Sequence, residues 1–65
     1  MIEAKDITAS DKLACVEREL KMRKSVYPRW EEVGKISAGK ATWELTVMEA
    51  IVADYRAAVE KERLI

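Results

Sequence analysis

Two long stretches of the chain carry apolar side chains at the three- and four-residue spacing of one α-helix face. In the second stretch, six apolar residues alternate steps of four and three, the heptad register of left-handed helix packing: Ala41, Leu45, Met48, Val52, Tyr55 and Val59. The first stretch has the same spacing, with Arg23 in one slot among Leu13, Val16, Leu20, Tyr27 and Trp30. The pattern predicts two amphipathic helices, at about residues 9–33 and 38–63.

Residues that start and stop helices flank both stretches. The run Thr8-Ala9-Ser10-Asp11 offers side-chain oxygens that can accept from the free amides of a first helical turn. Gly34 stands where a left-handed helix stop is expected, and Ser37 is the next N-cap candidate. A connection this short puts the two helices side by side and antiparallel. The sequence therefore predicts one all-α domain over residues 1–65, a two-helix hairpin.

Pro28 lies inside the first predicted helix. Proline removes one backbone hydrogen bond, crowds the carbonyl of Lys24 and disfavours a helical conformation at Tyr27. Because the apolar spacing continues in phase past it, we expect one helix with a kink near residues 24–28. The alternative is a stop at Val26 followed by a short helix with Pro28 in its first turn.

The apolar stripe of each predicted helix is wider than one contact requires, which is a stripe of roughly 100°. The residues that widen it are Cys15, Met22, Val26, Val33, Val47, Ile51 and Ala58. A chain of 65 residues also buries only about 60% of its unfolded surface, so it is marginally stable alone. Cyclic two-fold pairs are the commonest oligomers. We therefore expect a homodimer that forms a four-helix bundle.

The composition offers no reactive constellation. The chain has one cysteine and no histidine, which leaves no intrachain disulfide, no zinc ligand set and no base for a serine or cysteine nucleophile. Its carboxylates lack the spacing of a metal loop. The sequence thus predicts a protein that is not an enzyme and needs no cofactor or metal. We expect Cys15 to be a buried, inert thiol, and Met22 and Met48 to fill gaps in the core.

Four aromatic residues are candidate anchors for a protein partner, because tryptophan and tyrosine are favoured at binding hot spots: Tyr27, Trp30, Trp43 and Tyr55. Trp43 lies at the margin of the second helix's apolar stripe, where its ring is either a lid over the end of the hairpin or an exposed anchor. The first interpretation of function is accordingly a module for protein–protein interaction or assembly.

Charge is balanced overall but not along the chain. Residues 12–29 carry six basic and two acidic side chains, whereas residues 42–65 carry three basic and five acidic ones. The alternative function is an accessory nucleic-acid-binding protein that contacts phosphates through its first helix. Its candidate residues are Arg18, Lys21, Arg23, Lys24 and Arg29.

Glu19 and Arg23 both fall in the apolar half of the first predicted helix, at the i, i+4 spacing that lets opposite charges meet. Two interpretations stay open. The pair sets the register between helices in an oligomer core, or it lies at a solvated edge of the stripe.

The chain resembles short, uncharacterised proteins encoded in bacteriophages and prophages of proteobacteria. The likeness spans about residues 11–55 and is carried by Asp11 to Arg23, Val26-Tyr27-Pro28-Arg29-Trp30, Gly34-Lys35-Ile36 and Met48-Glu49-Ala50-Ile51. It implies a bacterial or phage origin and a small accessory protein that acts by binding. Since there is neither an apolar run of membrane-spanning length nor the charge order of a secretion signal, we expect a cytoplasmic protein in the bacterial host.

Overall fold

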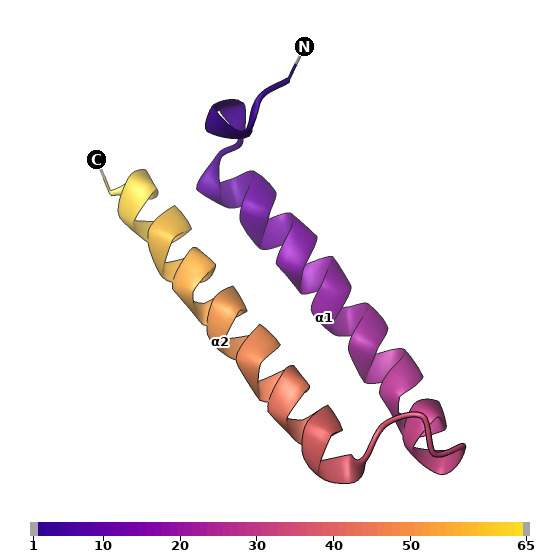
Figure 1. The fold of residues 1–65 in the computed structure, drawn as a ribbon. Coiled ribbons are helices and arrows are strands. Elements are labelled where there is room, and N and C mark those ends of the chain that lie inside the picture. The colour runs from indigo at the N-terminus through magenta and orange to yellow at the C-terminus, as the bar shows by residue number, and fades with distance from the viewer. Residues whose placement is uncertain (1, 65) are drawn as a thin grey trace.

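The computed structural model describes residues 2–64 and shows two long helices packed side by side (Figure 1). A short 3-10 turn, η1 (Ala4–Asp6), precedes helix α1 (Ala9–Glu32), and helix α2 (Ala38–Arg63) returns antiparallel to it. The predicted all-α hairpin is therefore confirmed, with boundaries within one residue of those expected. The two outermost positions of the predicted domain, 1 and 65, lie outside the described residues.

Both long helices begin at a capping side chain that the sequence pointed to. The Thr8 hydroxyl accepts from the Asp11 backbone N–H at 3.1 Å, and the Asp11 carboxylate accepts from the Thr8 backbone N–H at 3.0 Å, which is a capping box. The backbone hydrogen bond from Thr8 lowers the pKa of the Asp11 carboxyl, and the Thr8 hydroxyl adds to the shift. At the start of α2, the Ser37 hydroxyl accepts from the Lys40 backbone N–H at 3.1 Å.

Helix α1 ends at Glu32, and the chain turns at Gly34, where the sequence predicts a left-handed helix stop. Gly34 has φ 79°, a left-handed conformation that glycine adopts without a steric penalty from a Cβ atom. Its N–H donates to the Glu31 carbonyl at 3.2 Å, and the Lys35 N–H donates to the Trp30 carbonyl at 2.8 Å. These two bonds form a Schellman motif, which satisfies the last carbonyls of α1 and turns the chain back.

Helix α1 continues through Pro28 without interruption. The alternative prediction, a stop at Val26, is therefore wrong. The neighbouring Tyr27 is buried, so packing of α1 against α2 helps to offset the backbone hydrogen bond that proline removes.

The seam between the helices follows the predicted heptad positions. All six seam residues of α2 are buried or half-buried, and so are Leu13, Val16, Leu20 and Tyr27 of α1. Yet among residues 2–64 only Tyr27, Ala41 and Val52 are fully buried. The molecule measures 46 × 29 × 14 Å, so it is a single layer of two helices. Because a single layer has no third element above or below it, most seam side chains keep one edge in water.

Candidate functional site: the apolar side of the hairpin

Two salt bridges between the helices lie on the same long side of the hairpin. Arg56 reaches Glu17 at 2.9 Å, and Lys24 lies 3.9 Å from Glu49. Glu17, Glu49 and Arg56 each directly follow a seam residue in the sequence. At about 100° per residue, a position that follows the seam therefore falls on this side of either helix. We call it the polar side.

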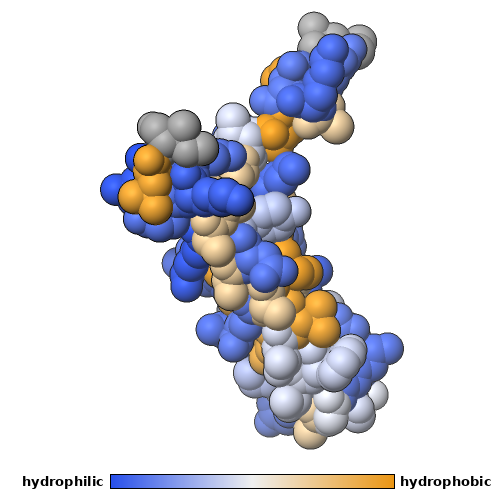
Figure 2. Space-filling view, turned by 90° about the vertical axis from the view of Figure 1, so that its left-hand side faces the viewer, coloured by the Kyte–Doolittle hydropathy of each residue, from blue (hydrophilic) through white to orange (hydrophobic). Residues whose placement is uncertain are grey.

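The positions that directly precede the seam fall on the opposite side of both helices, and there the composition changes. Five of these positions are Glu19 and Val26 of α1 and Val47, Ile51 and Ala58 of α2. We call this surface, together with the adjoining Trp30 and Arg23, the apolar side. The apolar stripe of each helix is wider than one contact requires, and in both helices it widens toward this common surface. Figure 2 views the hairpin from the α2 edge, where orange and tan patches lie among blue ones and the loop end is mostly pale.

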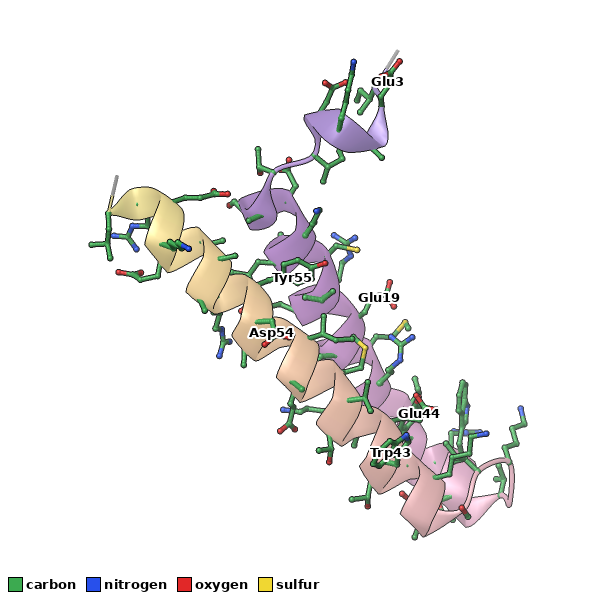
Figure 3. The ribbon with its side chains drawn as sticks, turned by 60° about the vertical axis from the view of Figure 1, so that its left-hand side comes forward. Glu3, Glu19, Trp43, Glu44, Asp54 and Tyr55 are labelled. Carbon is green, nitrogen blue, oxygen red and sulfur yellow. The ribbon has the colours of Figure 1, made fainter. Side chains whose placement is uncertain are left out.

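Large side chains on this surface remain open to water in the isolated chain. Trp30 is 40% exposed and Val47 is 36% exposed, while Trp43 and Met22 lie at its outer edges and are more exposed still. Trp43 projects from the loop end of α2 in Figure 3. Soluble monomers rarely expose a contiguous apolar surface along their whole length, and those that do commonly use it for contact.

Glu19 and Arg23 form an ion pair near the middle of the apolar side. The Arg23 guanidinium lies 3.0 Å from the Glu19 carboxylate and also donates to the Glu19 backbone carbonyl at 3.2 Å. The hydrogen bond to Glu19 raises the pKa of Arg23, and a smaller contribution comes from Tyr27. Both side chains are only partly exposed. Hence the ion pair forms within α1, and part of it remains exposed to solvent.

The structure separates the four aromatic candidates into two kinds. Tyr27 is buried in the seam, with its ring centre 5.6 Å from that of Trp30, and Tyr55 is half-buried with the Lys12 ammonium 5.9 Å from its ring centre. These tyrosines hold the two helices together. Trp43 is 67% exposed, so it does not form a lid over the hairpin, and that interpretation is wrong. Trp30 and Trp43 remain the candidate anchors with free ring surface.

The five basic candidates do not form one patch. Arg18, Lys21, Lys24 and Arg29 are exposed on the outer and polar sides of α1. Arg23 lies on the apolar side, and its charge is paired with Glu19. Lys24 faces Glu49 at 3.9 Å, which partly neutralises it. Of the five candidates, Arg18, Lys21 and Arg29 have no ion-pair partner among residues 2–64, and these three are left for the nucleic-acid hypothesis.

Two expectations about the core are corrected. Cys15 is exposed rather than buried, and Met22 is 50% exposed rather than a gap-filler. Both were assigned from the width of the apolar stripe in α1. The single second helix covers the centre of that stripe and not its far edge. Met48, which lies on the α2 seam, is half-buried as expected.

Sequence reasoning recognised the broad stripes but missed that they meet on one side. The signal was present in the order of residues: half of the positions before a slot of the two heptad patterns are apolar, whereas the positions after one carry only polar residues, alanine or proline. Glu44 precedes the seam residue Leu45, so it also lies on the apolar side, where it is half-buried; sequence reasoning did not single it out.

Within residues 2–64 there is no pocket and no cluster of potential metal ligands. In the same part of the chain, neither helix has an apolar stretch long enough to cross a bilayer. Comparison with protein-family models, curated proteins and solved structures finds no match to this chain.

Proposed function

We propose that the protein is a non-catalytic module that self-associates as a homodimer and acts through protein–protein contact. One observation supports this proposal above the others. Among residues 2–64, three buried side chains are a very small core for two long helices, whereas Trp30 and Val47 on the apolar side are left in water. Burying a Val, Ile or Trp side chain contributes about 1.5–3 kcal/mol, so covering this surface is the largest stabilisation open to the chain.

In this proposal, two hairpins stack through their apolar sides and form a four-helix bundle. The arrangement gives each helix a second apolar neighbour, as in other bundles of antiparallel helices. A bend in α1 near Pro28 belongs to the same proposal. Pro28 follows the seam residue Tyr27 and so lies on the polar side, where loss of the hydrogen bond to Lys24 opens the helix. The end of α1 would then curve toward the apolar side.

Sedimentation equilibrium over a wide concentration range tests self-association. We expect the mass to rise from that of a 7.4 kDa monomer to twice that value, and helix content to rise with it. A well-ordered monomer at the highest concentration would falsify the dimer.

A phage or prophage origin and action in the bacterial cytoplasm complete the proposal, supported by the resemblance described above. Trp43 is the candidate contact with a further protein, since it lies at the outer edge of the apolar side and keeps most of its ring free. Affinity capture from a bacterial lysate, with Trp43→Ala as the matched control, tests this role. A specific partner should be retained by the wild type and lost by the variant.

The second candidate function is nucleic-acid contact through the outer face of α1, which is supported by the exposed Arg18, Lys21 and Arg29. Such contact would be to phosphates and independent of sequence. It should weaken steeply as salt is raised, because bound phosphates release counterions. Titration with duplex and single-stranded DNA at low and moderate salt decides the matter, and the absence of salt-sensitive binding removes this candidate.

A further inference from the structure

Glu19 and Arg23 lie on the apolar side with one face of the ion pair still free. We propose that a second copy of the chain covers this side head to tail, so that Arg23 of each copy reaches Glu19 of the other. This inference rests on the proposed self-association and adds its surface, its orientation and its central contact.

The size of the surface suits a second copy. Helix α1 has 24 residues, and at 1.5 Å per residue it is roughly 36 Å long. Two helices of about 10 Å diameter side by side make the surface roughly 20 Å wide. The product is roughly 700 Å² per copy, close to the roughly 800 Å² per partner that a stable interface of standard size buries.

The position of the ion pair favours the head-to-tail orientation. Consider a two-fold axis that lies in the plane of the interface and is perpendicular to the helices. It places α1 on the partner's α1, and the two α1 helices run in opposite directions. Glu19 and Arg23 bracket the middle of α1 (Ala9–Glu32). If the axis passes between them, Arg23 of one copy stands opposite Glu19 of the other, and the four charges alternate in sign.

The other two-fold orientation brings the loops together and lays α1 on the partner's α2. The salt bridges Glu17–Arg56 and Lys24–Glu49 set residues 19–23 of α1 level with the middle of α2. Residues 47–54 of α2 carry no basic side chain, so Glu19 would meet hydrocarbon there and no opposite charge. Setting a carboxylate against hydrocarbon costs free energy unless it keeps its hydrogen bonds. Only the head-to-tail orientation offers an opposite charge to both members of the pair.

Charge reversal with purified, full-length variants tests the contact between copies. Arg23→Glu and Glu19→Arg should each weaken self-association at least tenfold, because like charges then meet across the interface. Mixed together, the two variants should associate at least tenfold more tightly than either does alone, since all opposed charges are complementary in the mixed dimer. The double variant should return to within threefold of the wild type.

The mixing experiment separates an intermolecular role from an intrahelical one. A pair that acts only within α1 gives no gain on mixing, and neither does the orientation with the loops together. Arg18→Glu is the matched control. It makes the same charge reversal as Arg23→Glu, but on the outer face of α1, and should leave self-association unchanged. Far-UV circular dichroism checks that every variant keeps its helices.

Spin labels at the loop test the orientation independently. In a Cys15→Ser background, a label at Lys35→Cys should lie roughly 35 Å from its counterpart in a head-to-tail dimer. With the loops together the separation is within roughly 20 Å. A dimer with close labels and no gain on mixing overturns this inference and leaves the proposed self-association intact. A monomer at all concentrations overturns both.

Discussion

The two long sides of the hairpin are made by the same two helices, and the positions that form them lie only two residues apart in the sequence. On the polar side, charged residues join the helices through exposed pairs such as Arg56 with Glu17. On the apolar side, Trp30 and Val47 are left in water beside the ion pair of Glu19 and Arg23. The polar side is thus complete in the single chain, and the apolar side is not.

The apolar side also offers the larger interaction energies. An exposed ion pair contributes about 0–1 kcal/mol, because solvent screens its charges and long side chains lose freedom. A large apolar side chain contributes about 1.5–3 kcal/mol once it is covered. Most of the stability still available to this protein therefore lies on the apolar side. A substitution there should lower the affinity of the dimer more than it lowers the stability of the hairpin.

The largest expected effect comes from placing a charge in the seam that both sides share. Val52→Asp puts a carboxylate at a buried position without a partner, which should cost more than about 3 kcal/mol and abolish the helical signal. Thermal melts followed by circular dichroism measure it. Ala53→Asp adds the same charge one residue later, on the polar side, and should keep the fold. Equal loss in both variants would mean that the seam is not where the structure places it.

The next effect compares the sides directly through neighbouring residues of α2. Val47→Lys puts a charge on the apolar side and should weaken the dimer by about 2 kcal/mol, roughly thirtyfold. Thr46→Lys puts it on the other side, where the Thr46 hydroxyl only donates to the Thr42 carbonyl at 2.8 Å, and should change affinity less than about twofold. Sedimentation equilibrium gives both constants. If the two variants behave alike, the sides are not functionally different.

A smaller effect is expected at Pro28, where the proposed bend turns α1 toward the apolar side. Pro28→Ala restores an N–H donor for the Lys24 carbonyl and should stabilise the hairpin by about 1 kcal/mol. This is a fraction of the roughly 3 kcal/mol by which alanine is more favourable than proline inside a straight helix. The same change should weaken the dimer several-fold. Ser25→Ala controls for helix propensity alone. An increase in both hairpin stability and dimer affinity would remove the bend from the proposal.

The smallest effect is expected on the polar side. A double-mutant cycle with Arg56→Ala and Glu17→Ala should give a coupling below about 0.5 kcal/mol, because solvent reaches both side chains and screens their charges. The coupling should shrink further in high salt. Denaturant titration measures it. A coupling of about 2 kcal/mol or more would show that the polar side contributes as much as the apolar one.

Most of the fold could be predicted because its signals are local. The Ser37 cap, the Gly34 stop and the heptad from Ala41 to Val59 each depend on residues within one or two turns of helix. The dimer, the bend and the partner stay predictions. The errors, at Cys15 and Met22, share one cause, which also kept the two interpretations of Trp43 open. Periodicity shows which residues belong to an apolar stripe, but it does not show how much of that stripe a single neighbouring helix covers.

The order of residues along the chain is enough to specify two capped helices, their antiparallel return and their shared seam, because each depends on contacts within a few residues or on one repeating period. Which way the surplus apolar residues face is a different kind of property. It depends on the rotation of each helix against the other, which the packing of Tyr27, Ala41 and Val52 in the seam sets. Only the assembled pair brings Val26 and Trp30 of α1 onto one surface with Val47 and Ile51 of α2, because residues so distant in sequence meet only after the chain has folded back.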